Sequence, residues 1–195
     1  MTIAHFLMTY PEALSRDVCE SIVERFEKDP RRRPSRTASS PNPKVRTGTQ
    51  LEIPKFPEWR DVVELVDATI RRHLPDYVEK FPGVRHLAHP DSFTITKALL
   101  ERIEPGQGYG YHIDAGPPGT EDRFLSTIIY LRDVAEGGFT EFPFQERQIP
   151  PRAGTLVMFP PFWTHIHRGV PPISNTKYNI TNFLVIRRPP ARPPT

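Results

Sequence analysis

The spacing of apolar residues predicts two helices in the first half of the chain. Over residues 11–28, five apolar side chains recur at intervals close to one helical turn: Leu14, Val18, Ile22, Val23 and Phe26. Charged residues occupy the other faces, and Pro30 ends the pattern. A similar stripe over residues 58–73 predicts a second helix. Both patterns are typical of helices that pack one face against a core.

After Pro90 the pattern changes to that of strands. Four runs rich in β-branched and aromatic residues follow one another: 93–103, 125–131, 155–159 and 178–186. Segments rich in Gly, Pro, Asp and Asn separate them and predict turns. Short strands after two helices predict a mainly β fold, an antiparallel sandwich or open barrel with the flanking α-helices packed outside.

Two segments carry neither pattern. Residues 31–50 are polar, basic and interrupted by proline, so we expect a long mobile loop that could act as a lid. Residues 187–195 read RRPPARPPT, and because proline cannot donate to a sheet, they predict an extended tail. We therefore expect a single domain over residues 1–186, with helical support over about 1–90 and a β core beyond.

Composition and charge argue against several classes of protein. Its 26 Lys and Arg residues nearly balance 23 Asp and Glu residues, which does not favour nucleic acid as a partner. Cys19 is the only cysteine, so neither an intrachain disulfide nor a cysteine-based zinc cluster can form, which fits a reducing compartment. We find no signal peptide and no apolar run long enough to span a membrane, and we expect a cytoplasmic protein.

His112 stands out among the seven histidines because Asp114 follows it two positions later. Side chains at i and i+2 of an extended segment point to the same side, so this pair could offer a nitrogen and an oxygen to one ion. His165 and His167 lie on a later predicted strand that a barrel would bring close. Two histidines and a carboxylate on one face of an ion are typical of non-haem Fe(II) oxygenases. A catalytic zinc site would accept the same ligands.

Lys177 follows His167 by ten residues and opens the last predicted strand. An iron oxygenase that consumes 2-oxoglutarate must hold a dianion, and its distal carboxylate needs a cation deep in the barrel. A lysine buried there without an anion would be costly, so the ligand would be its partner. The plain alternative is a solvated surface lysine.

Four segments together resemble a known family: EPGQGYGYHID, RFLSTIIYLRDVAEGGFTEFP, PRAGTLVMFP and HRGVPPISNTKYNITNF. In this order they resemble the 2-oxoglutarate- and Fe(II)-dependent oxygenases, specifically the prolyl 4-hydroxylase-like branch. The resemblance covers about residues 95–186 and implies a double-stranded β-helix, the jelly-roll or cupin-like core. It also implies Fe(II), with 2-oxoglutarate and O2 as cosubstrates and ascorbate as a further candidate cofactor. The implied reaction hydroxylates an unactivated C–H bond and releases succinate and carbon dioxide.

The resemblance implies a role for each matching residue. His112, Asp114 and His167 match the catalytic iron ligands. His167 is favoured over His165 because it precedes the glycine and stands ten residues before the lysine, although spacing alone does not choose between them. Lys177 matches the residue that binds the distal carboxylate of 2-oxoglutarate.

Five further positions bear on the cosubstrate and the substrate. Thr140 resembles a threonine whose hydroxyl helps to bind 2-oxoglutarate. Tyr109, Arg123 and Phe183 resemble substrate-binding residues, although many members have tryptophan at the last position. Ile103 departs from the pattern, since plant- and algal-type members place there a tyrosine that helps to hold 2-oxoglutarate.

Several alternatives for the function stay open. The branch resemblance favours a prolyl residue in a peptide or protein as substrate, with a free amino acid or natural-product intermediate as the alternative. A non-catalytic module that binds metal and 2-oxoglutarate, or a zinc hydrolase, would belong to other classes. The basic cluster could attract an anionic partner: Arg31, Arg32, Arg33, Arg36 and Arg46. The oligomeric state cannot be read from these patterns.

Overall fold

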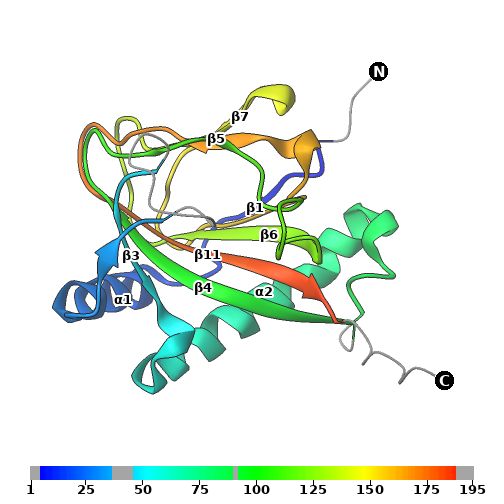
Figure 1. Cartoon of the computed structure of the whole chain (residues 1–195), viewed down its shortest axis with the longest axis horizontal. Helices are drawn as coiled ribbons and strands as arrows, with labels where there is room; N and C mark the ends of the chain where they lie inside the picture. The colour runs from blue at the N-terminus through cyan, green and yellow to red at the C-terminus, as the bar shows by residue number, and fades with distance from the viewer. Residues whose placement is uncertain (1–4, 37–45, 90–91, 188–195) are drawn as a thin grey trace.

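The computed structural model describes residues 5–36, 46–89 and 92–187 (Figure 1). Two α-helices are found in these ranges, α1 (Arg16–Lys28) and α2 (Arg60–Lys80). Short 3₁₀ helices flank α2 and interrupt the β region: η1 (Ile53–Lys55), η2 (Pro57–Trp59), η3 (Pro82–Val84), η5 (Pro143–Gln145) and η6 (Trp163–His165).

The larger sheet has seven strands in the order β1-β9-β6-β11-β4-β3-β2. They are β1 (Met8–Tyr10), β2 (Arg33–Pro34), β3 (Thr49–Glu52), β4 (Phe93–Ile103), β6 (Arg123–Tyr130), β9 (Leu156–Phe159) and β11 (Lys177–Ile186). All of its pairings are antiparallel, and β11 lies at the centre between β4 and β6.

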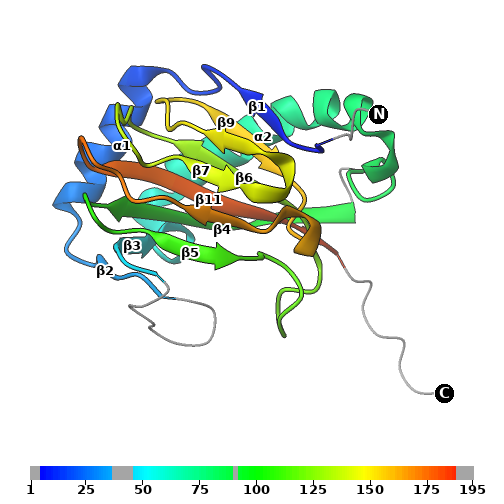
Figure 2. The same cartoon turned by 90° about the horizontal axis from the view of Figure 1, so that it is seen from above.

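The smaller sheet has four antiparallel strands in the order β5-β10-β7-β8. They are β5 (Tyr109–His112), β7 (Thr140–Phe142), β8 (Arg147–Ile149) and β10 (His167–Gly169). This sheet lies over the inner face of the larger one (Figure 2).

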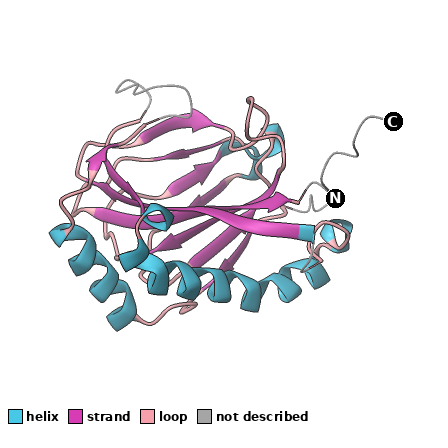
Figure 3. Cartoon of the chain, turned by 60° about the horizontal axis from the view of Figure 1, so that its bottom comes forward, coloured by secondary structure: helices cyan, strands magenta, loops and turns pink. Residues whose placement is uncertain are grey.

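The molecule is built in three layers, with α1 and α2 covering the outer face of the larger sheet (Figure 3). Their apolar stripes form the main core against that face, with Phe26, Trp59 and Ile70 fully buried. A second cluster fills part of the space on the inner face: Ile128, Tyr130, Phe142, Val157 and Phe159. Two facing antiparallel sheets with outer helices confirm the predicted mainly β class with a jelly-roll core.

Both helices differ from their predicted bounds. Helix α1 begins at Arg16 rather than at residue 11, because Ser15 is its N-cap and accepts a hydrogen bond from the Val18 N–H at 3.4 Å. Helix α2 continues past residue 73 and through Pro75 to Lys80. Its buried stripe extends to Leu74 and Tyr77, and this packing outweighs the hydrogen bond that Pro75 cannot donate.

The prediction of one continuous loop over residues 31–50 was wrong at both ends. Arg33–Pro34 pairs with Thr49 and Gln50, and β3 then joins β4 through the partners Leu51 and Leu100. Leu51 is buried in the main core, which fixes β3 against the sheet. Residues 37–45, the middle of the expected mobile loop or lid, and residues 188–195 of the tail lie outside the described residues.

No helix in the described part of the chain is sufficiently long and apolar to cross a membrane. That residues 1–186 form one domain remains our prediction.

Candidate metal centre and its pocket

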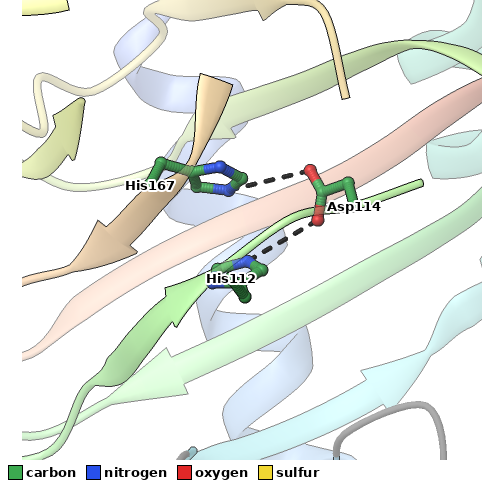
Figure 4. A group of neighbouring side chains, drawn as sticks. All are labelled: His112, Asp114 and His167. Carbon is green, nitrogen blue, oxygen red and sulfur yellow. Dashed lines mark ion pairs between the residues drawn. The ribbon is translucent and has the colours of Figure 1, made fainter. Parts of the chain in front are cut away.

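Three side chains from two strands converge between the sheets (Figure 4). His112 ends β5, Asp114 follows two residues later, and His167 begins β10, directly opposite His112 in register. Nε2 of His112 lies 3.6 Å from Asp114 Oδ1, and Nε2 of His167 lies 3.7 Å from Asp114 Oδ2. The three candidate ligand atoms all lie within 4.8 Å of one another. The structure therefore brings these sequence-predicted residues together.

Backbone carbonyls orient both imidazole rings. Nδ1 of His112 lies 2.9 Å from the Gly110 carbonyl oxygen, and Nδ1 of His167 lies 3.0 Å from that of His165. A ring nitrogen that faces a carbonyl oxygen must donate, so Nε2 of each neutral ring keeps its lone pair for the centre. Metal-binding histidines are commonly held in this way by a group behind the ring.

The Asp114 carboxylate is held in its charged form. Ser126 Oγ donates to Asp114 Oδ2 at 2.7 Å. Burial alone raises the pKa of Asp114, but the neighbouring His167 and His112 side chains and the Ser126 hydroxyl more than offset it and hold the pKa well below its usual range. Burial lowers the pKa of His167 to about 4, so this ring is neutral near pH 7.

This donor set fits a divalent cation. Two neutral imidazole nitrogens and one carboxylate oxygen can occupy one face of an ion, which is the ligand type of non-haem Fe(II) sites. Zinc accepts the same donors, so the three ligands alone do not select between the two metals.

A cavity between the two sheets contains the metal centre and extends along β11 from Lys177 to Phe183. It is lined by every site residue that the sequence predicted: Tyr109, His112, Asp114, Arg123, Thr140, His167, Lys177 and Phe183. Lys177 and Thr140 lie at a buried end. Pro117, which is exposed, borders the cavity near Arg123 and Phe183. The cavity therefore has a polar interior and an open end.

Lys177 is a buried cation at the closed end of this cavity. Only 4% of its surface is exposed, and burial lowers its pKa to about 8. Within the described residues its ammonium group makes no hydrogen bond or ion pair, and its near neighbour is the ring of Tyr130, with the centroid 5.2 Å from Nζ. A buried ammonium without an ion-pair partner is costly, and the charge of Glu101, which acts to raise the pKa of Lys177, only partly offsets burial, so this geometry favours a negatively charged ligand in the cavity.

A pair of hydroxyl groups lies beside Lys177. Tyr130 Oη is 2.7 Å from Thr140 Oγ1, and both residues are buried. If the phenol donates to Thr140, the threonine hydroxyl keeps its own hydrogen for an anion in the cavity. The sequence singled out Thr140 but missed Tyr130. Tyr130 lies two residues after Ile128 on β6, and Ile128 lines the cavity. Because alternate residues of a strand face the same side, this spacing could have placed Tyr130 on the inner face.

The sequence also missed a buried ion pair in the cavity wall. Arg46 donates to Glu101, and the Asn179 amide lies 3.4 Å from the second carboxylate oxygen of Glu101. Side chains of Arg46 and Glu101 are only 12% and 9% exposed. Glu101 and Asn179 each lie two residues from a predicted cavity position, Ile103 and Lys177, but Arg46 comes from a segment that no pattern connected to the site.

Comparison with known proteins gives a match over the part of the chain that forms most of the two sheets. The family described as the 2OG-Fe(II) oxygenase superfamily matches residues 98–185, which include the metal centre and Lys177. Over these residues the chain has the sequence of a 2OG-Fe(II) oxygenase.

Its similarity within the 2OG-Fe(II) oxygenases is to the prolyl 4-hydroxylase-like branch. A probable prolyl 4-hydroxylase 9 of Arabidopsis thaliana is 30% identical over 148 residues, or 70% of this chain, and the chain spans 46% of that relative. The structure of a viral collagen prolyl hydroxylase from Paramecium Bursaria Chlorella virus-1, a 2OG complex, has a TM-score of 0.70 at 20% identity, covering 92% of this chain and 95% of that one. A prolyl hydroxylase of Trichoplax adhaerens, solved with a hypoxia inducible factor peptide, has a TM-score of 0.69 at 15% identity, covering 93% and 84%.

The three predicted substrate residues all line the oxygenase cavity. The Tyr109 ring stacks on His112, with centroids 3.6 Å apart. The Arg123 guanidinium lies 3.8 Å from the centroid of Phe183 and donates to the Asp114 carbonyl oxygen at 2.6 Å. Arg123 thus supports the loop that carries a candidate ligand, besides facing the cavity.

His165 does not share a strand face with His167, and this part of the prediction was wrong. It ends η6, and a single residue separates it from the start of β10. Its Nε2 lies 2.8 Å from the His5 carbonyl oxygen, and its Nδ1 lies 2.9 Å from the Thr164 hydroxyl. Both nitrogens are therefore occupied away from the centre, which favours His167 as the ligand.

The basic cluster is largely neutralised within the protein. Arg31 pairs with Asp29 and Glu58, Arg32 with Glu27, Arg33 with Glu52, and Arg46 with Glu101. These pairs offset the charge of four of the five arginines, whereas for Arg36 the backbone N–H donates to Gln50 Oε1 at 3.0 Å.

The Ser126 hydroxyl offers a test of the metal centre that spares the ligands. Ser126→Ala removes the hydrogen bond to Asp114 Oδ2, so we expect divalent metal affinity to fall by about 10- to 100-fold. Equilibrium titration with Mn(II) or Co(II) measures this. Thr127→Ala, a change of the adjacent buried strand residue whose side chain does not line the cavity, is the matched control. Equal affinities of wild type and Ser126→Ala would show that this bond does not support the centre.

Proposed function

We propose that this protein is an Fe(II)- and 2-oxoglutarate-dependent dioxygenase that hydroxylates a prolyl residue in a peptide or protein. The observation that carries the proposal is the buried, unpaired Lys177 in the same cavity as His112, Asp114 and His167. A metal centre alone would fit a zinc hydrolase, but a hydrolase has no evident use for a buried cation at the closed end of its cavity. A bound diacid accounts for both features.

The roles of the residues follow from their positions. His112, Asp114 and His167 would hold Fe(II), and Lys177 and Thr140 would bind the distal carboxylate of 2-oxoglutarate. When bound, Fe(II) supplies the redox chemistry by which O2 converts 2-oxoglutarate to succinate and carbon dioxide while a C–H bond is hydroxylated. The protein itself supplies orientation and a dry environment, since Leu99, Ile103 and Ile128 line the inner wall.

The absence of the branch tyrosine at position 103 has a structural compensation. Ile103 lies opposite Lys177 in the β4–β11 register and contributes only apolar surface to the cavity. The Tyr130 phenol enters from β6 on the other side of β11 and contacts Thr140. We assign Tyr130 as a positioning residue that directs the Thr140 hydroxyl toward the carboxylate.

This assignment predicts a moderate effect for Tyr130→Phe. Loss of one hydrogen bond within the pair should weaken 2-oxoglutarate binding by about 2- to 10-fold, since such bonds contribute roughly 0.5–1.5 kcal/mol. Isothermal titration with Mn(II)-loaded protein measures the affinity. The double variant with Thr140→Val should be no weaker than Thr140→Val alone. Additive losses would show that the two hydroxyls act separately.

The prolyl substrate rests on the relatives, all three of which bear prolyl hydroxylase names and one of which was solved with a peptide. Tyr109 and Phe183 supply aromatic surface of the kind on which proline rings pack.

A screen for succinate formation tests the function. Proline-containing peptides, free amino acids and small organic acids are each incubated with the protein, Fe(II), 2-oxoglutarate and O2, and products are examined for the gain of one oxygen atom. We expect a peptide to give the strongest turnover. If a free amino acid or a small acid is turned over faster than any peptide, the proposal of a prolyl substrate is wrong. Binding of metal and 2-oxoglutarate without turnover of any class would favour a non-catalytic module.

A further inference from the structure

The two candidate histidine ligands are supported differently by the fold. His167 lies on β10, an inner strand of the smaller sheet, and its ring packs against Phe142 and Phe159 with centroids 5.3 and 4.8 Å away. His112 lies on β5, an edge strand of the same sheet. An edge strand has a partner in its sheet on one side only, so the position of His112 depends on support from outside the smaller sheet.

Tyr109, the first residue of β5, supplies part of this support. Its ring stacks on the His112 imidazole, with centroids 3.6 Å apart and planes 18° apart. The other ring that packs against His112 in the described part of the chain is that of His167, tilted by 54° with centroids 4.2 Å apart. Tyr109 therefore sets the plane of the His112 ring, and a rotation of the phenol would change the angle at which the imidazole faces the metal.

Arg46 contacts Tyr109 through both its side chain and its backbone. The guanidinium carbon lies 4.6 Å from the centroid of the Tyr109 ring, within the range of a cation–π contact. The backbones of the two residues form an antiparallel bridge. Beside this bridge the Thr47 N–H donates to the Gly108 carbonyl oxygen at 2.9 Å, and the Gly108 N–H donates to Thr47 Oγ1 at 2.8 Å. These contacts join the edge of the smaller sheet to the segment that leads into β3.

The Arg46 guanidinium is itself held on two sides. It donates to the Glu101 carboxylate on β4 and, at 3.0 Å, to the Arg36 carbonyl oxygen. A planar group that donates in two directions has little freedom to turn away from the phenol ring. A chain of contacts therefore runs from Glu101 in the larger sheet through Arg46 and Tyr109 to His112.

We propose that Arg46 is a positioning residue for the metal centre and acts on His112 through the Tyr109 ring. The inference rests on the proposed function, because it takes His112 as a metal ligand. Without the guanidinium the phenol and the imidazole gain freedom to turn. The geometry of the ligands around the metal should then change, which a role in stability alone would not require.

The experiment uses the full chain with Co(II) and without 2-oxoglutarate, because the visible absorption of Co(II) depends on the geometry of its ligands. The double variant R46M/E101Q removes the guanidinium and the charge of its partner together, so no unpaired carboxylate remains in the cavity wall. We expect Co(II) affinity to fall by about 2- to 30-fold, the range of one cation–π contact, and the absorption bands to shift.

R102M is the matched control. Arg102 follows Glu101 on β4 and pairs with Glu27 at 3.0 Å, but its side chain does not line the cavity. Its loss removes a half-buried arginine from the same strand without touching Tyr109. We expect the affinity and the spectrum of R102M to match those of the wild type. Wild-type affinity and spectrum in R46M/E101Q would overturn the proposal.

A Tyr109→Leu background shows whether Arg46 acts through the ring. Once the stack is removed, R46M/E101Q should cause no further loss of Co(II) affinity. Additive losses would show that Arg46 acts by another route, and the proposal would be wrong. If R46M/E101Q does not fold, Arg46→Lys takes its place. Lysine keeps the charge pair but lacks the planar donors, so its Co(II) bands should still shift, and an unchanged spectrum would contradict the assigned role.

His112→Ala separates this proposal from the proposed function. If His112→Ala loses Co(II) while the Arg46 variants bind it as the wild type does, only the role of Arg46 is wrong. If His112→Ala binds Co(II) with wild-type affinity, His112 is not a ligand, and both this proposal and the proposed metal centre fail.

Discussion

Replacing His167 by alanine is expected to abolish high-affinity metal binding, whereas His165→Ala is expected to retain it. His167 Nε2 points at Asp114 from the strand paired with β5, and its loss removes one of the three donors. We expect affinity to fall by more than the roughly 10- to 100-fold that is typical of losing only an outer hydrogen bond. His112→Ala and Asp114→Ala should behave like His167→Ala. Anaerobic titration with Fe(II), with Mn(II) as a redox-stable probe, measures the affinity.

His165→Ala is the control because it removes an imidazole two residues away without removing a donor. The His165 carbonyl oxygen that accepts from His167 Nδ1 belongs to the backbone and remains. The variant loses the contacts to His5 and Thr164, which should cost about 1–3 kcal/mol in unfolding free energy but less than tenfold in metal affinity. If His165→Ala failed to bind metal while His167→Ala still bound it, His165 and not His167 would be the ligand.

The sequence predicted the long strands well because their patterns are local. The run from Phe93 to Ile103 matches β4, and the run from 178 to 186 matches β11 within one residue, since both are continuous in β-branched and apolar residues. Strands of two to four residues, such as β2 and β10, have too few positions to show a period. Their positions depend on partners distant in sequence.

The candidate site was predictable where chemistry and spacing coincide. His112 and Asp114 follow the two-residue period of an extended segment, and Lys177 begins a strand whose pattern is strong. The arrangement of His165 depends instead on the turn at η6 and on a contact to His5, 160 residues away. Arg46 similarly meets Glu101 across 55 residues. No local pattern records such pairings, because they arise only when the sheets assemble.

Lys177→Met is expected to weaken 2-oxoglutarate binding strongly while leaving metal affinity nearly unchanged. Methionine keeps most of the length of the side chain but removes the charge that would face the distal carboxylate. A hydrogen bond to a charged group contributes about 1.5–3 kcal/mol, so affinity should fall by about 10- to 150-fold. Titration of the Mn(II)-loaded protein with 2-oxoglutarate measures the loss. Equal losses of metal and cosubstrate affinity would contradict the assigned role.

The same variant should be at least as stable as the wild type when no ligand is bound. Burial holds the pKa of Lys177 at about 8 in the folded protein, below its usual 10.5. Below pH 8 the ammonium is charged in both the folded and the unfolded state, so its full desolvation cost lowers the stability of the wild type. Between pH 8 and 10.5 the folded protein releases the proton first, so the stability of the wild type rises toward that of Lys177→Met. Chemical denaturation of both proteins over this range measures the difference.

Binding of the diacid should show the opposite dependence on pH. The dianion needs the charged ammonium, so the affinity of the wild type for 2-oxoglutarate should decline as pH rises above about 8, whereas that of Lys177→Met should stay level. The cost of burying Lys177 in the free protein and its gain in the complex are thus two consequences of one unpaired charge. A Lys177→Met variant that loses stability at pH 7 and keeps its affinity would show that the ammonium is structural, and the assignment of the diacid site would be wrong.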